Sequence, residues 1–270
     1  MELVVVLVAL YAIECCVWVG QGQVVISGLS KGRFGYRVGP HVPSGRRGGL
    51  FLATVWPPVS ITLVFRTPPE PRFDVTAIEA GWTLFASKTR LLWYACHAAW
   101  TYVLIVTPAV IFWRGIASTW PFLVAGWIAI LAVIVPEFAS AFRACHPGGD
   151  RLSKLAAVVL SPMSATRACD LLARELLASH HPLAAAYVLC PREIFDRLAR
   201  WCYFCDDPAI GTRHDVDGFL AAVGRRDEVL RPPVREDAAF LSYCPRCQSQ
   251  YTRSAGHCAD CGGLQVQPFA

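Results

Sequence analysis

Four cysteines near the C-terminus have the spacing of a metal site. Cys244/Cys247 and Cys258/Cys261 form two C-x-x-C pairs within YCPRCQSQYTRSAGHCADCGG. Each pair places two thiolates on one tight turn, and two such turns supply the four soft ligands of a tetrahedral Zn²⁺ site. We therefore predict a structural zinc site here, with iron as the alternative metal, because four thiolates also suit iron. Four thiolate ligands leave no open coordination position, so we expect no catalysis at this metal.

The two knuckles, Cys-Pro-x-Cys and Cys-x-x-Cys-Gly, resemble those of the zinc-ribbon family. The resemblance covers residues 241–270 and implies a compact ribbon in which a short hairpin brings the two pairs together. With four thiols present, His257 is expected to lie outside the ligand set. The chain as a whole resembles uncharacterised bacterial multi-pass membrane proteins with a terminal zinc ribbon, and this resemblance implies no activity.

A third C-x-x-C pair, Cys202/Cys205, has no matching second pair nearby. A second metal site would have to recruit ligands from His214, Asp215 and Asp217. A redox role would need an exposed thiol of low pKa beside a thioredoxin-like βαβ pattern, which the sequence lacks. We expect the pair to be buried, with its sulfurs acting as small apolar groups.

Three ionisable residues fall inside apolar segments: Glu14, His97 and Glu137. Such residues usually face the interior of a helical bundle and mark functional sites. Two carboxylates and an imidazole could relay protons or hold a divalent metal. Polar contacts between helices, or side chains that reach the headgroups, are the alternatives that the sequence leaves open.

Three long apolar segments predict an α-helical membrane protein. Hydrophobic residues make up 54% of the 270 positions and charged residues only 17%, against about a quarter in soluble domains. The segments 3–20, 91–113 and 120–142 are each long enough to cross a core of about 30 Å. The first could be a secretory signal, but it lacks a basic start and a clear cleavage site, which favours an uncleaved anchor.

Basic residues predict the orientation of these spans. Nine lysines and arginines lie between the first and second spans and several follow the third, whereas only Arg114 lies between the second and third. Positive charge stays in the cytoplasm, so the N-terminus is expected outside and the C-terminus inside an inner cell membrane. Trp93, Trp113 and Trp120 lie near the predicted span ends, where interfacial aromatics are favoured.

Residues 21–90 are expected to form a β-rich cytoplasmic segment. The predicted strands combine alternation with β-branched residues between Gly and Pro clusters, at 24–26, 33–38, 59–65 and 73–76. The uncharged stretch 49–65 has the alternative of entering the bilayer, although Pro57-Pro58 divides it into halves too short to cross alone.

Residues 143–240 are expected to be cytoplasmic and mainly helical, with a linker at Pro232-Pro233 before the ribbon. Amphipathic patterning predicts a helix at 170–177, and Pro191 suits the start of another that continues to residue 200. His180-His181 is expected at a helix end rather than as a ligand pair. The short apolar helix 154–160 is expected at the membrane face or in a core.

The sequence carries no catalytic signature: no G-x-S-x-G, no H-E-x-x-H, no phosphate-binding loop and no dinucleotide fingerprint. We therefore expect a non-enzymatic protein that contacts membrane lipid and binds a protein partner on its cytoplasmic side, with self-association as a further expectation. Nucleic-acid binding is not expected, because Asp260 offsets Arg246 and Arg253 and aromatic residues are few. The rival hypothesis is a membrane enzyme or small transporter that uses the Glu14, His97 and Glu137 cluster.

Overall fold

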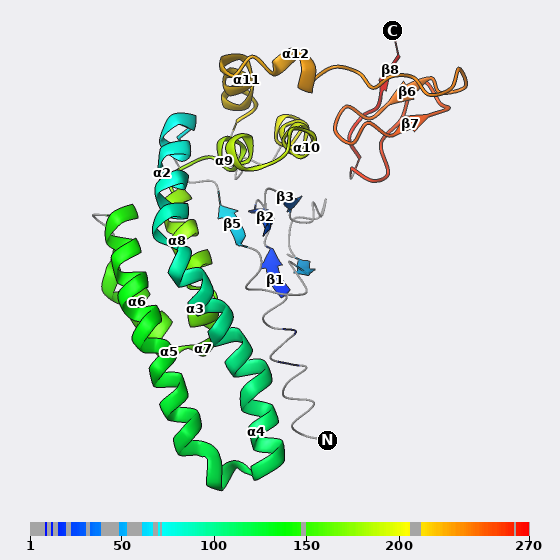
Figure 1. The fold of residues 1–270 in the computed structure, drawn as a ribbon. Coiled ribbons are helices and arrows are strands. Elements are labelled where there is room, and N and C mark those ends of the chain that lie inside the picture. Colours follow the sequence, from blue (N-terminus) through cyan, green and yellow to red (C-terminus); the bar gives the residue numbers. More distant parts are fainter. Residues whose placement is uncertain are drawn as a thin grey trace.

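A long helical hairpin, a small β-sheet with helices α2 and α8 on one side and α9 and α10 at one end, and a C-terminal module make up the fold (Figure 1). The computed structural model describes residues 9, 12, 16–19, 23–30, 33–38, 49–52, 61–66, 70, 72–146, 150–205, 212–261 and 263–269. The loop of the hairpin lies at one end of the molecule, and the C-terminal module lies at the other (Figure 1).

The first arm of the hairpin is a nearly continuous rod of helices. It consists of α2 (Val75–Lys88), α3 (Arg90–Thr101), the π-helical turn η2 (Tyr102–Val106) and α4 (Thr107–Arg114). Pro108 has no N–H and crowds the preceding turn, and a wider π turn just before it accommodates such a residue. At Gly115, with φ of 74°, the chain reverses into the second arm, α5 (Ile116–Cys145).

The two arms are in contact where Tyr102 faces Gly126. The Tyr102 hydroxyl donates to the Leu123 carbonyl oxygen at 2.6 Å, and a Cβ on Gly126 would lie 2.6 Å from the same hydroxyl. Any larger residue at position 126 would therefore displace the Tyr102 side chain from this position. Among the described residues, two helical stretches are long and apolar enough to cross a membrane, Arg90–Arg114 and Ser118–Cys145. The predicted hairpin of helices at 91–113 and 120–142 is thereby confirmed as helical.

Within the described part of the chain, seven further helices follow the hairpin. They are α6 (Arg151–Leu160), α7 (Pro162–Thr166), α8 (Ala168–Leu177), α9 (Pro182–Leu189), α10 (Arg192–Tyr203), α11 (Arg213–Ala222) and α12 (Arg226–Val229). Helices α6 and α8 pack on α5, while α7 and α8 pack on α3. These contacts cover the base of the hairpin, and α9 to α12 continue away from its loop (Figure 1).

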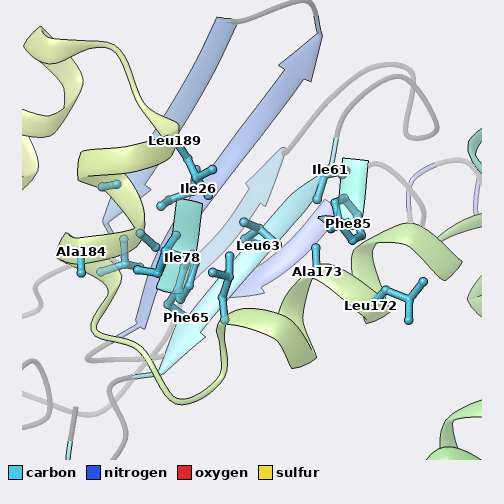
Figure 2. Close-up of a cluster of buried hydrophobic side chains, with 14 of the residues drawn as sticks. Ile26, Ile61, Leu63, Phe65, Ile78, Phe85, Leu172, Ala173, Ala184 and Leu189 are labelled. Carbon is cyan, nitrogen blue, oxygen red and sulfur yellow. The ribbon is translucent and has the colours of Figure 1, made fainter. Parts of the chain in front are cut away.

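A three-stranded antiparallel sheet lies at the centre of the core, in the order β3 (Arg33–Val38), β2 (Gln23–Ser30), β5 (Thr62–Arg66). Ile26 pairs with Leu63 and Val24 with Phe65, so apolar residues of neighbouring strands share one face. Helices α2, α8 and α9 supply Ile78, Phe85, Leu172, Ala173, Ala184 and Leu189 to the same cluster (Figure 2). Strands β1 (Cys16–Val19) and β4 (Gly49–Leu52) form a separate pair.

Three parts of the sequence prediction need correction. Residues 16–19 form strand β1, so the helix predicted over 3–20 is wrong at its end; residues 3–15, apart from 9 and 12, lie outside the described residues. Residues 73–76 are not a strand, because Asp74 caps α2 by accepting the Ala77 N–H at 2.9 Å. In the stretch 49–65, residues 49–52 and 62–65 are strands, and 53–60 are not described.

Candidate metal centre

The C-terminal module is built on three very short strands: β6 (Ser242–Tyr243), β7 (Gln250–Tyr251) and β8 (Gln267–Pro268). Strand β6 lies in the middle, antiparallel to both neighbours. The first C-x-x-C turn connects β6 to β7, and the second lies between β7 and β8. This arrangement brings both turns to one end of the small sheet and is compatible with a zinc ribbon.

The four cysteines of the module lie close enough together to hold one metal ion. The sulfurs of Cys244, Cys247, Cys258 and Cys261 all lie within 4.8 Å of one another, and Cys247 Sγ is 3.6 Å from Cys258 Sγ. A tetrahedral ion bound at about 2.3 Å to each thiolate would place its sulfurs about 3.8 Å apart. The observed cluster therefore needs only small shifts to close around an ion.

The backbone holds the two turns in nearly equivalent ways. In the first, the Gln248 N–H donates to the Cys244 carbonyl at 2.8 Å; in the second, the Gly263 N–H donates to the Cys258 carbonyl at 3.2 Å. Gln248 adopts φ of 63° and Gly263 φ of 95°, the left-handed region in which glycine is favoured. The second turn is one residue longer, and glycine at position 263 suits that conformation.

The four thiols of this cluster differ in how readily they ionise. The hydrogen bond from Cys244 lowers the pKa of the Cys247 thiol to about 4, with further help from Ser249. The same hydrogen bond and burial raise the pKa of Cys244, and burial raises the pKa of Cys261 to about 12. Tyr251 donates its hydroxyl to Cys258 Sγ at 3.0 Å. One thiolate is therefore readily available, and a cation would favour ionisation of the other three.

Arg246 connects the first turn to the helical body. Its side chain is only 6% exposed, and its guanidinium donates to the Phe204 carbonyl at the end of α10 and to the Cys261 carbonyl at 3.4 Å. A cation is favoured at a helix C-terminus. Four thiolates around a divalent ion carry two net negative charges, so Arg246 would also offset charge at the loaded site.

The third C-x-x-C pair has a different environment. Cys202 is 1% exposed and Cys205 is 6% exposed, and burial raises the pKa of Cys202. Asp215 forms a capping box with Thr212, and Asp217 accepts from Arg226 at 2.8 Å. Within the part of the chain that the structure describes, the cluster of Cys244, Cys247, Cys258 and Cys261 is the only metal-ligand group of three or more.

The histidine pair is located at a helix end, as predicted. His181 caps α9: its Nδ1 accepts the Leu183 N–H at 3.0 Å, and its ring stacks on Phe73 at 4.6 Å. His180 forms a single β-bridge with Arg72, and burial lowers its pKa.

The predicted intramembrane cluster remains a prediction. Glu14 lies outside the described residues. His97 Nδ1 lies 2.8 Å from the Trp93 carbonyl oxygen in its own helix, and its ring lies 5.3 Å from that of Trp93. Glu137 is half-buried on α5. Among the residues described, no hydrogen bond or ion pair joins His97 to Glu137.

A buried ionic group beside the sheet escaped the sequence analysis. Asp170 on α8 is 5% exposed and accepts from Arg167 at 3.0 Å, with Arg174 nearby. Burial raises the pKa of Asp170 to about 6, although both arginines oppose the shift. The only sequence signal was an acidic residue on the apolar side of the 170–177 helix.

The geometry thus identifies one closed group of four thiols and no second metal-ligand cluster in the described parts of the chain. Comparisons with protein families, with curated proteins and with solved structures find no match to this chain.

Proposed function

We propose that this chain is a multi-pass inner-membrane protein whose cytoplasmic, zinc-stabilised C-terminal module presents a binding surface for another protein. The observation that carries the proposal is that the two ends of the molecule have different surfaces and contents. An uncovered apolar hairpin occupies one end, and a closed group of four thiols, without an open ligand position, occupies the other (Figure 1).

The outer part of the hairpin supports the membrane placement. Its exposed large apolar side chains include Phe112 at 78%, Trp113 at 83%, Phe122 at 75% and Ile128 at 60%. Soluble monomers rarely expose so large a continuous apolar surface. Lipid would cover these side chains, and Trp113 and Trp120 beside the hairpin loop would lie at the distal interface.

Charge supports the proposed orientation. Among the described residues, Lys88, Arg90, Arg143 and Arg151 lie at the base of the hairpin, and Arg114 is the only basic residue at its loop. The side of the membrane that retains basic residues is the cytoplasmic side, so the base and the C-terminal module are assigned to it. A reducing compartment also keeps the four thiols available for metal.

The surface beside the thiol cluster supports a binding role. A hollow of about 550 Å³ lies between α10 and the first cysteine turn. Arginine and tryptophan, which are enriched at energetically important positions of interfaces, supply most of its lining: Arg197, Arg200, Trp201 and Arg246. A surface of this kind can bind a partner without catalysing a reaction, as expected beside a metal site that has no open coordination position.

The membrane placement can be tested at exposed apolar residues near the middle of the two arms, Ile105 at 47% and Ile128 at 60% exposure. Ile105→Asp together with Ile128→Asp should leave a water-exposed hairpin folded, but should expel a lipid-embedded one, because each carboxylate costs several kcal/mol in the bilayer core. The measurement is the fraction of full-length protein that floats with liposomes. Val234→Asp is the matched control, because Val234 is 88% exposed near the C-terminal module. Unchanged flotation of the double variant would refute the membrane placement.

The binding role can be tested by affinity capture from membranes in mild detergent. The intact chain is compared with a chain truncated after Asp237 and with Cys258→Ser, which removes one metal ligand. A partner should be recovered with the intact chain and with the control Cys190→Ser, and lost from the other two. Recovery of the same proteins with all four chains would contradict a role for the module.

A further inference from the structure

The hairpin is covered at its base and uncovered beyond a sharp boundary. At the base, Leu92, Ala99, Phe138 and Phe142 are at most 1% exposed, because α6, α7 and α8 pack around them. The boundary is marked by α7, where the Cys96 thiol donates to the Ala165 carbonyl at 3.4 Å. Beyond it, both arms continue without neighbours among the described helices.

The length of the uncovered part matches the thickness of a bilayer core. Arg114, the last residue of the first arm, lies eighteen positions after Cys96. At 1.5 Å per residue this is about 27 Å, close to the hydrocarbon thickness of about 30 Å. With the loop at the distal interface, α7 would lie at the proximal edge of the hydrocarbon.

The turn between α6 and α7 carries an apolar surface at this same level. Leu160 is 82% exposed and Val159 is 39% exposed, and Pro162 is exposed beside them. They lie within six residues of Ala165, which contacts Cys96. The run 155–166, LAAVVLSPMSAT, contains no charged residue. The basic residues nearest to this run are Lys154 before it, which pairs with Glu175, and Arg167 after it, which pairs with Asp170.

We infer that the α6–α7 turn, residues 158–162, is a third membrane contact, in which Val159, Leu160 and Pro162 insert into the lipid interface beside the hairpin. The inference rests on the proposed membrane placement of the hairpin. Two features identify lipid as the occupant. The apolar surface of the turn continues that of the hairpin, and it ends where the length of the uncovered arms places the edge of the hydrocarbon. The turn would set how deeply the body lies on the membrane.

Photocrosslinking in the full-length protein tests this contact. A benzophenone side chain replaces Leu160 in protein reconstituted into phosphatidylcholine–phosphatidylglycerol vesicles, and lipid adducts are measured by mass spectrometry. Leu152 is the matched control: it lies on the same helix and is 78% exposed, but eight residues earlier. That separation is about 12 Å along the helix, which would place Leu152 outside the hydrocarbon, on the side away from the hairpin loop. Phe112 in the hairpin and Val234 near the module are the positive and negative controls.

We expect lipid adducts at positions 112 and 160, with a yield at 160 at least about fivefold above that at 152, and none at 234. Adducts at 112 without adducts at 160 would overturn the inference and leave the membrane hairpin intact. Crosslinks from 160 to protein would also overturn it, and would show that a second copy or a partner covers the turn. Absence of lipid adducts at both 112 and 160 would refute the proposed membrane placement itself.

Discussion

The helical body and the C-terminal module are stabilised by different means. The body buries a continuous apolar core from its sheet and helices, with residues such as Leu63, Leu172 and Leu183 at 1% exposure or less. The module buries three of its four clustered cysteines and Val266, with Tyr251 and Leu264 packed beside them. About thirty residues cannot bury enough apolar surface to fold alone, so small modules of this kind depend on a metal or disulfides.

The difference shows what a C-x-x-C pair means in each context. In the module, two pairs face each other and their sulfurs form the centre of the core. In the body, Cys202 and Cys205 have no second pair opposite and pack among apolar residues at the end of α10. The same motif therefore forms a group of thiols that could hold a metal ion in one region, and supplies small buried side chains in the other.

Removal of the metal should have the largest effect, and only in the module. Structural zinc contributes on the order of 10–16 kcal/mol of apparent binding free energy in small zinc modules. We expect a strong chelator, or Cys258→Ser, to unfold residues 241–269 while the helical body stays folded. Hydrogen exchange followed by mass spectrometry would show loss of protection confined to the module. Metal analysis of the intact protein should give one zinc per chain. Unchanged protection after complete metal removal would show that the module folds on packing alone.

Truncation of a core residue should produce the reverse pattern. Leu172 is fully buried, on the side of α8 that is turned away from the strands (Figure 2), and α8 packs on α3 and α5. Leu172→Ala leaves a cavity and should cost about 2–5 kcal/mol of the free energy of unfolding. Thermal unfolding in detergent should show a lower Tm for the body, with unchanged zinc content. Loss of zinc from this variant would indicate that the module and the body unfold together.

The sequence predicted the elements that depend on local periodicity or spacing, and missed those that depend on packing between residues far apart in the chain. The hairpin helices, strands 24–26 and 33–38, and the closeness of the four cysteines all follow from local periodicity or spacing. The start of α2 was misread, because Val75-Thr76 favours a strand by propensity while the Asp74 cap and packing on α8 and α9 favour a helix. The covered base of the hairpin could not be foreseen either: Phe138 and Phe142 are as apolar as the exposed residues of the hairpin, such as Phe112 and Phe122, and differ only in what packs on them.

The buried Asp170 gives the body a pH dependence that the module does not share. Its pKa is raised to about 6 in the folded protein from 3.8, chiefly by burial. Folding therefore favours the protonated form, so its contribution to stability is greatest below pH 4 and is lost as pH rises through 6. The full change is at most about 3 kcal/mol. Asp170→Asn should remove this component, and the difference in Tm between the two proteins from pH 4 to 7.5 measures it. A difference of opposite sign would mean that Arg167 and Arg174 outweigh burial.

The smallest effect on stability is expected from substitution of Cys202, and this substitution compares the two kinds of C-x-x-C pair most directly. Cys202→Ala removes a single buried sulfur atom, which should cost about 1 kcal/mol through the small cavity that remains. Because Cys202 is 1% exposed and burial raises its pKa, its thiol should also react slowly with alkylating reagents in the folded protein. The zinc content of Cys202→Ala and Cys205→Ala should stay at one ion per chain, whereas Cys258→Ala should lose the metal. If either substitution in the body reduced the zinc content, the Cys202/Cys205 pair would have to affect the module through the contact in which Arg246 donates to the Phe204 carbonyl, between the two cysteines in sequence. Arg246→Ala tests this explanation, because it breaks that contact and leaves all four cysteines of the module in place.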